Sequence, residues 1–165
     1  VAIAANQIET EYVINLQGDE PLISSISLNK MISMLTILNK REDFIISGIE
    51  PIDFQEALDL NEAKCALIKR TKKIKYLSRQ PLVNFAAGSS DPVYFKQLGL
   101  FAFSVRSLKK FNNLPVGELE KAEDLELIRG IENDINIYSC IMMDQTISVD
   151  TPNDLARVID KIKKE

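Results

Sequence analysis

The stretch Tyr12-Val13-Ile14-Asn15-Leu16-Gln17-Gly18-Asp19-Glu20-Pro21 decides the fold. A short apolar run that stops at a glycine, two acids and a proline predicts a buried strand that ends at the edge of a sheet. In open α/β sheets, ligands bind at the edge where the strands end. An ordinary turn after a core strand has the same local pattern, so the function of this stretch depends on whether a second motif reaches the same edge.

A second motif lies near the other end of the chain, where Asp150 follows Ile147-Ser148-Val149. This run predicts a brief strand, and the next four residues predict a helix start, with Thr151 as the cap, proline at the first position and an acid at the third. Because Thr151 already supplies the cap, Asp150 is available to face a ligand. Asp19 and Asp150 both end apolar runs and can converge at one sheet edge. Two such carboxylates indicate Mg²⁺ held for phosphoryl or nucleotidyl transfer.

The composition indicates one ordinary globular domain over residues 1–165. Hydrophobic residues make up 45% and charged residues 27%, which are average values, and no apolar run reaches membrane-spanning length. We therefore expect a cytoplasmic protein without a membrane partner. The net charge of −4 argues against nucleic acid as a partner, because binding it requires a basic surface.

Two residue types narrow the chemistry further. The chain has no histidine, which excludes an imidazole base and the usual zinc ligands, so any metal must sit on oxygen ligands. Cys65 and Cys140 lie in apolar runs and are expected to be buried free thiols.

The remaining pattern predicts alternating strands and helices. We expect a fragment of helix over 1–6, whose beginning is absent, further helices over 27–40, 105–111, 118–131 and 151–162, strands over 44–49, 96–104 and 135–143, and a hairpin formed by 65–70 and 74–79. The first strand, helix and strand imply parallel strands joined by a right-handed crossover. Leu155, Val158, Ile159 and Ile162 are expected to form the buried stripe of the last helix.

Four further features admit a structural and a functional interpretation. The basic hairpin turn is either solvated or binds phosphate, and the loop over 86–92 is either a connection or a cover over substrate. Gly99 inside a strand indicates close approach of backbone or ligand. The acids of 118–131 can complement the helix dipole, but Glu123 and Glu126, three apart on one predicted face, can also grip ligand hydroxyls.

Four collinear stretches carry a family resemblance: residues 13–23, 76–81, 119–129 and 149–155. The first, Val-Ile-Asn-Leu-Gln-Gly-Asp-Glu-Pro-Leu-Ile, resembles the signature of 3-deoxy-manno-octulosonate (Kdo) cytidylyltransferases, the CMP-Kdo synthetases. The others resemble, in the same order, the family's Tyr-Phe-Ser-Arg-X-Pro segment, its glutamate-rich helix and its penultimate motif. Together the matches span nearly the whole chain.

The resemblance implies a three-layer, Rossmann-like α/β nucleotidyltransferase fold with a mixed, mostly parallel sheet and a hairpin region that forms a homodimer. It also implies transfer of CMP from CTP to the anomeric hydroxyl of an acid sugar, with release of pyrophosphate, in lipopolysaccharide biosynthesis. By the same resemblance Asp19 and Asp150 would coordinate Mg²⁺, Gln17 and Glu126 would contact the sugar, and Arg79 would lie near the site.

Three sugar-facing positions depart from the family pattern. Gln97 stands where the family has histidine, Phe101 where it has tyrosine, and Leu127 where it has glutamine. Gln97 remains a candidate substrate-binding residue, but the loss of polar groups at the other two positions favours a modified, Kdo-like acid.

The family's N-terminal phosphate-binding loop has no counterpart here, so the chain resembles the C-terminal two-thirds of the family domain. We expect such a chain to lack CTP turnover alone. Two alternatives stay open: a related nucleotidyltransferase for another sugar acid, and a non-catalytic dimerisation module.

Overall fold

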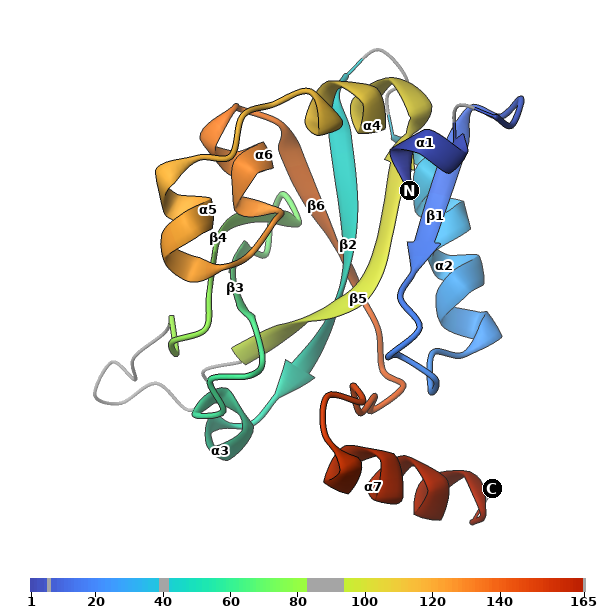
Figure 1. The fold of residues 1–165 in the computed structure, drawn as a ribbon, viewed down its shortest axis with the longest axis vertical. Coiled ribbons are helices and arrows are strands. Elements are labelled where there is room, and N and C mark those ends of the chain that lie inside the picture. Colours follow the sequence, from blue (N-terminus) through green and yellow to red (C-terminus); the bar gives the residue numbers. More distant parts are fainter. Residues whose placement is uncertain (6, 39–41, 83–93, 165) are drawn as a thin grey trace.

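A computed structural model describes residues 1–5, 7–38, 42–82 and 94–164, and its six strands form one mixed sheet (Figure 1). The strands lie in the order β1-β5-β2-β6-β4-β3. Their bounds are Tyr12–Leu16 (β1), Phe44–Ile52 (β2), Lys64–Ile68 (β3), Lys73–Ser78 (β4), Tyr94–Ser104 (β5) and Asn136–Ile141 (β6). The helices are Ala2–Ala5 (α1), Ser25–Ile37 (α2), Phe54–Ala57 (α3), Val105–Asn112 (α4), Glu118–Glu123 (α5), Ile128–Glu132 (α6) and Pro152–Ile162 (α7).

Strand direction explains why the sheet edge gathers functional groups. Strands β1, β2, β3 and β6 run one way, while β4 and β5 run the other way. The expected mixed sheet is confirmed, but the expectation of mostly parallel pairing is wrong for the described strands, where only β2 and β6 pair in parallel. The reason is that β5 lies between β1 and β2 and separates two strands that the crossover leaves parallel. The ends of β1, β2 and β6 still point to one edge.

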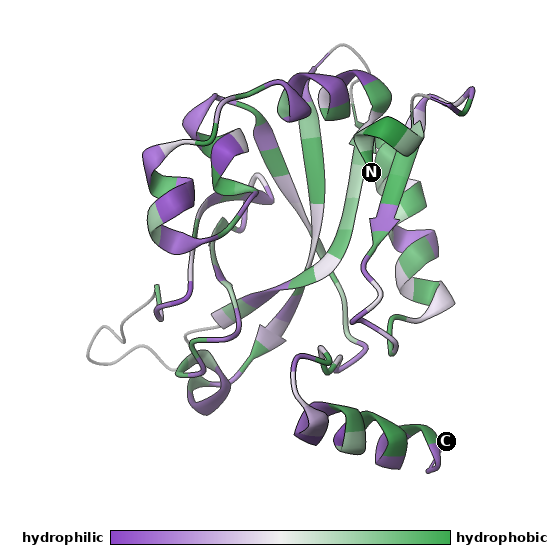
Figure 2. Cartoon of the chain, viewed as in Figure 1, coloured by the Kyte–Doolittle hydropathy of each residue, from purple (hydrophilic) through white to green (hydrophobic). Residues whose placement is uncertain are grey.

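Two clusters of buried side chains cover the two faces of the sheet. Alternate residues of β2 divide between them, with Ile45 and Ile49 in one and Phe44 and Ile46 in the other. The first cluster joins α1, α4 and the α5–α6 region, and the second joins α2 through Met31. The fold therefore has three layers, and Figure 2 shows the central strands as the most continuously hydrophobic part of the ribbon.

Strand β1 is less buried than its sequence predicts. It lies at the end of the strand order, and its residues are half-buried up to the exposed Leu16.

The predicted hairpin is confirmed by β3 and β4, and burial of Cys65 and Cys140 as free thiols is also confirmed. Among the described residues no helix is long and apolar enough to cross a membrane.

The acid-rich segment is two helices, not the one predicted over 118–131. Helix α5 ends at Glu123, its C-cap residue Asp124 adopts a left-handed conformation (φ 53°), and α6 begins at Ile128. The prediction of one continuous helix was wrong because a single residue in the left-handed conformation ends the first helix and changes the direction of the chain. Glu123 and Glu126 consequently do not share a helical face.

The helix predicted over 27–40 is also shifted, since Ser24 caps it and it ends at Ile37.

The C-terminal segment follows the prediction in its helix start but not in its packing. Thr151 caps α7 and forms a capping box with Asp154, as predicted. Residues 147–150, however, are not a strand, and of the predicted stripe only Val158 is buried. Leu155, Ile159 and Ile162 are 41–54% exposed. The predicted loop over 86–92 lies outside the described residues.

The left-handed residue that separates α5 from α6 gives a first prediction. Asp124→Gly should leave the free energy of unfolding unchanged or raise it, because glycine adopts positive φ without steric cost. Asp124→Val should lower it by about 1–2 kcal/mol, because a β-branched side chain clashes in this conformation. Urea unfolding of the two variants measures the difference. Equal stability of the two would contradict the break at residue 124.

A second prediction concerns the ion pair that ties α5 to α6. Both Arg129 Nε and Nη2 donate to the Glu120 carboxylate, at 2.7 and 2.5 Å, and both side chains are largely buried. The hydrogen bond from Arg129 lowers the pKa of Glu120 below its ordinary value. A carboxyl with a lowered folded-state pKa stabilises the fold above its unfolded pKa of about 4.3, and this stabilisation is lost as the pH falls through the folded-state pKa.

Glu120→Gln should therefore destabilise the chain by about 3 kcal/mol at pH 7, because it leaves the guanidinium buried without its carboxylate. The difference between the two proteins should shrink as the pH falls below about 4. Urea midpoints measured from pH 7 to pH 3 test this. A difference that is constant with pH would show that the pair contributes through packing and not through charge.

Candidate functional site

The turn after β1 is fixed by a buried glutamate. Glu20 is 4% exposed, and its Oε1 accepts hydrogen bonds from the Gly99 amide on β5 and from the Ser148 hydroxyl, both at 2.9 Å. The Gln17 amide donates to the Gly99 carbonyl at 2.8 Å, so the turn is held on both sides of Asp19. The sequence motif is therefore a junction of three chain segments and not an isolated turn.

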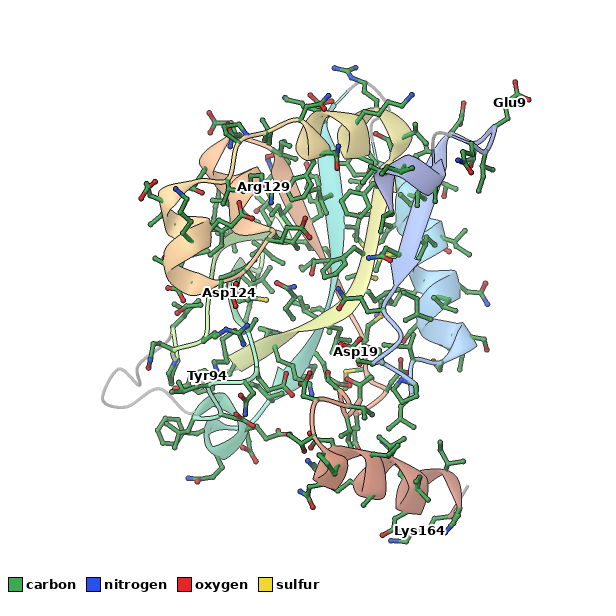
Figure 3. The ribbon with its side chains drawn as sticks, viewed as in Figure 1. Glu9, Asp19, Tyr94, Asp124, Arg129 and Lys164 are labelled. Carbon is green, nitrogen blue, oxygen red and sulfur yellow. The ribbon has the colours of Figure 1, made fainter. Side chains whose placement is uncertain are left out.

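The structure brings together the segments that carry the two predicted metal ligands. The Val149 amide donates to the Asp19 carbonyl at 2.9 Å, which places Asp150 one residue from this contact. Asp150 is exposed, whereas Asp19 Oδ1 is buried and has no hydrogen-bond partner among the described residues. Figure 3 shows Asp19 below the end of β1, on the side of the sheet that faces α7.

The donor set fits a hard cation only in part. A buried carboxylate oxygen without a partner is a group that a cation would satisfy, and Asp150 adds a second carboxylate. In the described part of the chain no cluster of three or more histidine, cysteine, aspartate or glutamate residues could hold a metal ion. Any Mg²⁺ bound here would therefore take its remaining ligands from water or substrate, as Mg²⁺ commonly does.

The four predicted substrate-binding residues line one cavity of about 460 Å³. They reach it from four places: Gln17 after β1, Arg79 after β4, Gln97 on β5 and Glu126 between α5 and α6. The rest of the wall includes Asn15, Phe101, Phe103, Leu108, Phe111, Asn112, Asp124, Leu125 and Leu127. The wall thus combines apolar side chains with convergent polar and charged groups, which suits a polar small molecule.

The Arg79 guanidinium is held in this cavity by backbone carbonyls of two segments that are distant in sequence. Its Nη1 donates to the Asn61 carbonyl at 2.8 Å, and its Nη2 lies 3.5 Å from the Asp124 carbonyl. Glu123 accepts from the Arg79 amide and the Ser78 hydroxyl, at 3.3 and 2.9 Å. The structure does not favour Glu123 as a ligand-binding residue, because its carboxylate fixes the end of β4 and does not line the cavity. Glu126, 72% exposed at its side chain, does face the cavity.

The positions that depart from the family pattern also line this cavity. Gln97 has a buried side-chain oxygen without a hydrogen-bond partner among the described residues. Phe101 and Leu127 are 7% and 4% exposed and present no polar group to a ligand. The substitutions therefore change one region of the wall from polar to apolar while leaving one amide oriented there.

Sequence reasoning missed two buried charges at the same sheet edge. Glu50 on β2 and Lys96 on β5 are 3% and 5% exposed, and with Glu20 they contact the segment that leads to Asp150. One sequence signal could have identified them: each is a charged residue inside an otherwise apolar strand. Burial of a charged side chain costs free energy unless the charge has partners. Lys96 and Asp150 also line a second cleft of about 300 Å³, next to the N-terminus of α7.

Of the two interpretations of the basic hairpin turn, phosphate binding gains no support from the structure. Lys73 donates to the Asn136 side chain at 2.8 Å and lies over the Tyr138 ring, and Lys72 takes the left-handed conformation of a turn residue. The residues of this turn do not line the 460 Å³ cavity.

The close approach predicted at Gly99 is confirmed and gives a third prediction. A Cβ at Gly99 would lie 2.5 Å from Gln17 Oε1 and 2.9 Å from Glu20 Cγ, whereas a Cβ at Gly18 would meet no atom within 4 Å. Gly99→Ala should therefore cost about 1–3 kcal/mol by overpacking and displace Gln17 from the cavity. Gly18→Ala, the matched control, should have little effect. Thermal unfolding compares them, and equal melting temperatures would contradict the contact.

Comparison with known proteins agrees with this geometry. The cytidylyltransferase family model matches residues 1–147. A 3-deoxy-manno-octulosonate cytidylyltransferase of Chlorobium phaeovibrioides is 32% identical over the whole chain, which spans 67% of that relative. An 8-amino-3,8-dideoxy-manno-octulosonate cytidylyltransferase of Shewanella halifaxensis is 33% identical over 89% of the chain, and the match covers 59% of that relative. The chain thus spans about three-fifths to two-thirds of the length of these proteins.

Solved structures give the same picture. A CMP:2-keto-3-deoxy-manno-octonic acid synthetase complexed with CTP superposes with a TM-score of 0.87 at 25% identity, over 99% of this chain and 66% of that one. The inositol-1-phosphate CTP transferase from T. maritima, 16% identical with a TM-score of 0.60, shares the fold. Family model, relatives and fold agree, and the chain belongs to the cytidylyltransferase family.

Proposed function

We propose that this protein transfers CMP from CTP to the anomeric hydroxyl of Kdo or a Kdo-like acid sugar, with release of pyrophosphate, as a step in lipopolysaccharide biosynthesis. The observation that carries the proposal is the 460 Å³ cavity, where all four residues expected to bind substrate come together from separate segments. The names of the Chlorobium and Shewanella relatives and of the CTP-bound structure support it.

In this proposal the cavity holds the acid sugar. Arg79 supplies a guanidinium for the sugar carboxylate, and charge-assisted bonds of this kind are among the stronger contacts in proteins. Gln17, Gln97 and Glu126 supply amide and carboxylate groups for hydroxyls. Because the Asn61 and Asp124 carbonyls hold the Arg79 guanidinium, the sugar would meet a charged group that is already oriented.

Asp19 and Asp150 would hold Mg²⁺ at the adjoining sheet edge. When bound, Mg²⁺ neutralises charge on the triphosphate and on the pyrophosphate that leaves. The fit is supported by the unpartnered Asp19 Oδ1 and by the contact of Val149 with the Asp19 carbonyl. The chain has no histidine, so orientation of the sugar hydroxyl by cavity side chains, and not an imidazole base, would prepare the nucleophile.

A modified sugar acid is the second candidate substrate, and the cavity wall favours it specifically. Phe101 and Leu127 are apolar where the family pattern has a phenol and an amide, so two hydroxyl partners are missing. A site without partners for a hydroxyl discriminates against a sugar that must bury it there. Relative affinities for Kdo, its 8-amino analogue and deoxy analogues would rank the substrates.

We also propose that the protein is cytoplasmic and forms a homodimer through the β3–β4 hairpin. Strand β3 lies at the end of the strand order, which leaves the hairpin near the rim of the sheet. Analytical ultracentrifugation measures the assembly. A dimer that binds neither CTP nor any sugar acid would favour the non-catalytic module instead.

The fourth prediction tests the sugar site and the metal site separately. Arg79→Met should weaken Kdo binding at least about tenfold in calorimetry with CTP and Mg²⁺ present, because it removes a charge-assisted hydrogen bond worth about 1.5–3 kcal/mol. Arg106→Met, which changes an exposed arginine on α4, is the matched control. Asp19→Asn should lower pyrophosphate release about a hundredfold or more in any active form of the enzyme, with little change in stability. Kdo affinity that is equal in the Arg79 and Arg106 variants would refute the assignment of the cavity.

A further inference from the structure

The segment from residue 142 to residue 151 has no helix or strand, yet buried charged side chains hold it. Glu50 and Lys96 lie opposite each other in the register of β2 and β5, and each is at least 95% buried. Burial of two charges in strand interiors is costly unless they are well paired. The contacts that they make therefore indicate what the pair does.

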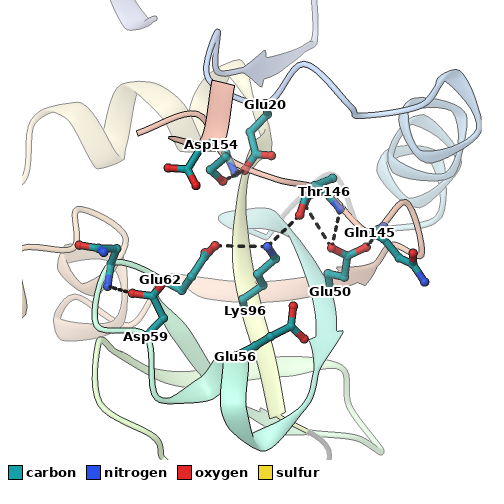
Figure 4. Close-up of polar contacts among 12 residues, drawn as sticks. Glu20, Glu50, Glu56, Asp59, Glu62, Lys96, Gln145, Thr146 and Asp154 are labelled. Atoms are coloured by element: carbon teal, nitrogen blue, oxygen red, sulfur yellow. Dashed lines mark hydrogen bonds and ion pairs between the residues drawn. The ribbon is translucent and has the colours of Figure 1, made fainter. Parts of the chain in front are cut away.

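These contacts converge on a single residue, Thr146 (Figure 4). The Glu50 carboxylate accepts from the Thr146 amide at 2.9 Å, from the Thr146 hydroxyl at 3.2 Å and from the Gln145 amide. Lys96 Nζ donates to the Thr146 carbonyl at 3.1 Å and to Glu62 at 3.3 Å. We call Glu50 and Lys96 together the Thr146 clamp, because they bind both the amide and the carbonyl of this residue.

The path from the Thr146 clamp to Asp150 is short and is tied on its other side. Gln145 has a φ of 52°, so the chain turns sharply as it enters the clamp. Two and three residues after Thr146, the Ser148 hydroxyl contacts Glu20 and the Val149 amide contacts the Asp19 carbonyl. Asp150 is the next residue, and α7 begins two residues later.

We propose that Glu50 and Lys96 are positioning residues, which set the path of residues 145–149 and thereby place Asp150 beside Asp19. The two side chains act through the backbone and touch neither aspartate. The inference depends on the proposed function only for the role of Asp150 as a metal ligand, since the path of the segment is independent of that role.

The fifth prediction measures this path by amide hydrogen exchange. In Glu50→Gln one carboxylate oxygen becomes an NH₂ group that faces backbone donors, so the Thr146 clamp should open. Protection of the Val149 amide should then fall at least about tenfold, although Glu50 does not touch it, while protection of the core amide of Ile46 stays unchanged. Unchanged protection at Val149 would overturn the proposal.

Lysine variants keep the test decisive if Glu50→Gln folds poorly. Lys96→Met should lower Val149 protection in the same way, and Lys96→Arg, which keeps a charged donor, should restore most of it. The matched control is Lys64→Met, because Lys64 is an equally buried lysine on β3 that bonds the carbonyls of Asp59 and Glu62 instead. A selective loss at Val149 in the Lys64 variant would show that any buried lysine has this effect, and would refute the clamp.

Mn²⁺ binding distinguishes the positioning role from a merely structural one. A merely structural role would leave the broadening by Mn²⁺ the same next to Asp19 and next to Asp150. Mn²⁺ added to the unaltered chain should broaden the amide resonances next to Asp19 and Asp150 at the same concentration. In Glu50→Gln the resonances next to Asp150 should require at least about ten times more Mn²⁺ than those next to Asp19. Joint broadening in both proteins would overturn the positioning role. Broadening at only one aspartate in the unaltered chain would refute the metal site and with it the purpose of the clamp, while the exchange data would still report the path of the segment.

Discussion

The site depends on the carboxylate of Glu20. Its Oε1 receives the Gly99 amide from β5 and the Ser148 hydroxyl from the segment before α7, so one oxygen joins three parts of the chain that are far apart in sequence. Burial raises the pKa of Glu20 above its ordinary value, and the two hydrogen bonds oppose that rise. A buried acid with these partners fixes the turn that carries Asp19 at one end and Gln17 at the other. The sheet edge that carries Asp19 and the 460 Å³ cavity thus share a single structural support.

Other charged side chains, of which Glu50 and Lys96 are buried, repeat this arrangement around the site. Glu50 and Lys96 hold Thr146, and Glu123 holds the end of β4 beside Arg79. In each case a charged side chain from a regular element binds the backbone of an irregular segment, and that segment carries a residue assigned to the site. Such contacts add little to net stability, because burial of the charge is costly, but they allow few alternative paths for the loop. Loops that must present ligands with fixed geometry benefit from this restriction.

Much of the fold was predictable because strands and caps depend on local sequence. The capping box at Thr151 and the hairpin of β3 and β4 follow from residue types at fixed spacing. The break at Asp124 and the exposure of Leu155 were not predictable, since a left-handed aspartate and a half-covered helix have the same sequence pattern as a continuous, packed one. In the site, Gln17, Arg79 and Glu126, which the motifs single out, line the same cavity. Glu50 and Lys96 were missed because their partners are backbone groups about 50 to 100 residues away, which no local pattern encodes.

The position of β5 between β1 and β2 has a consequence for how the chain folds. Residue 12 pairs with residue 104 and residue 45 with residue 103, so neither β1 nor β2 can pair with β5 until residues 94–104 have been made. Sheets closed by such distant contacts form slowly, and strand edges are prone to aggregate until they have paired. Strand β5 also carries Gly99 and Gln97 to the site. The cavity therefore cannot form before β5 joins the sheet.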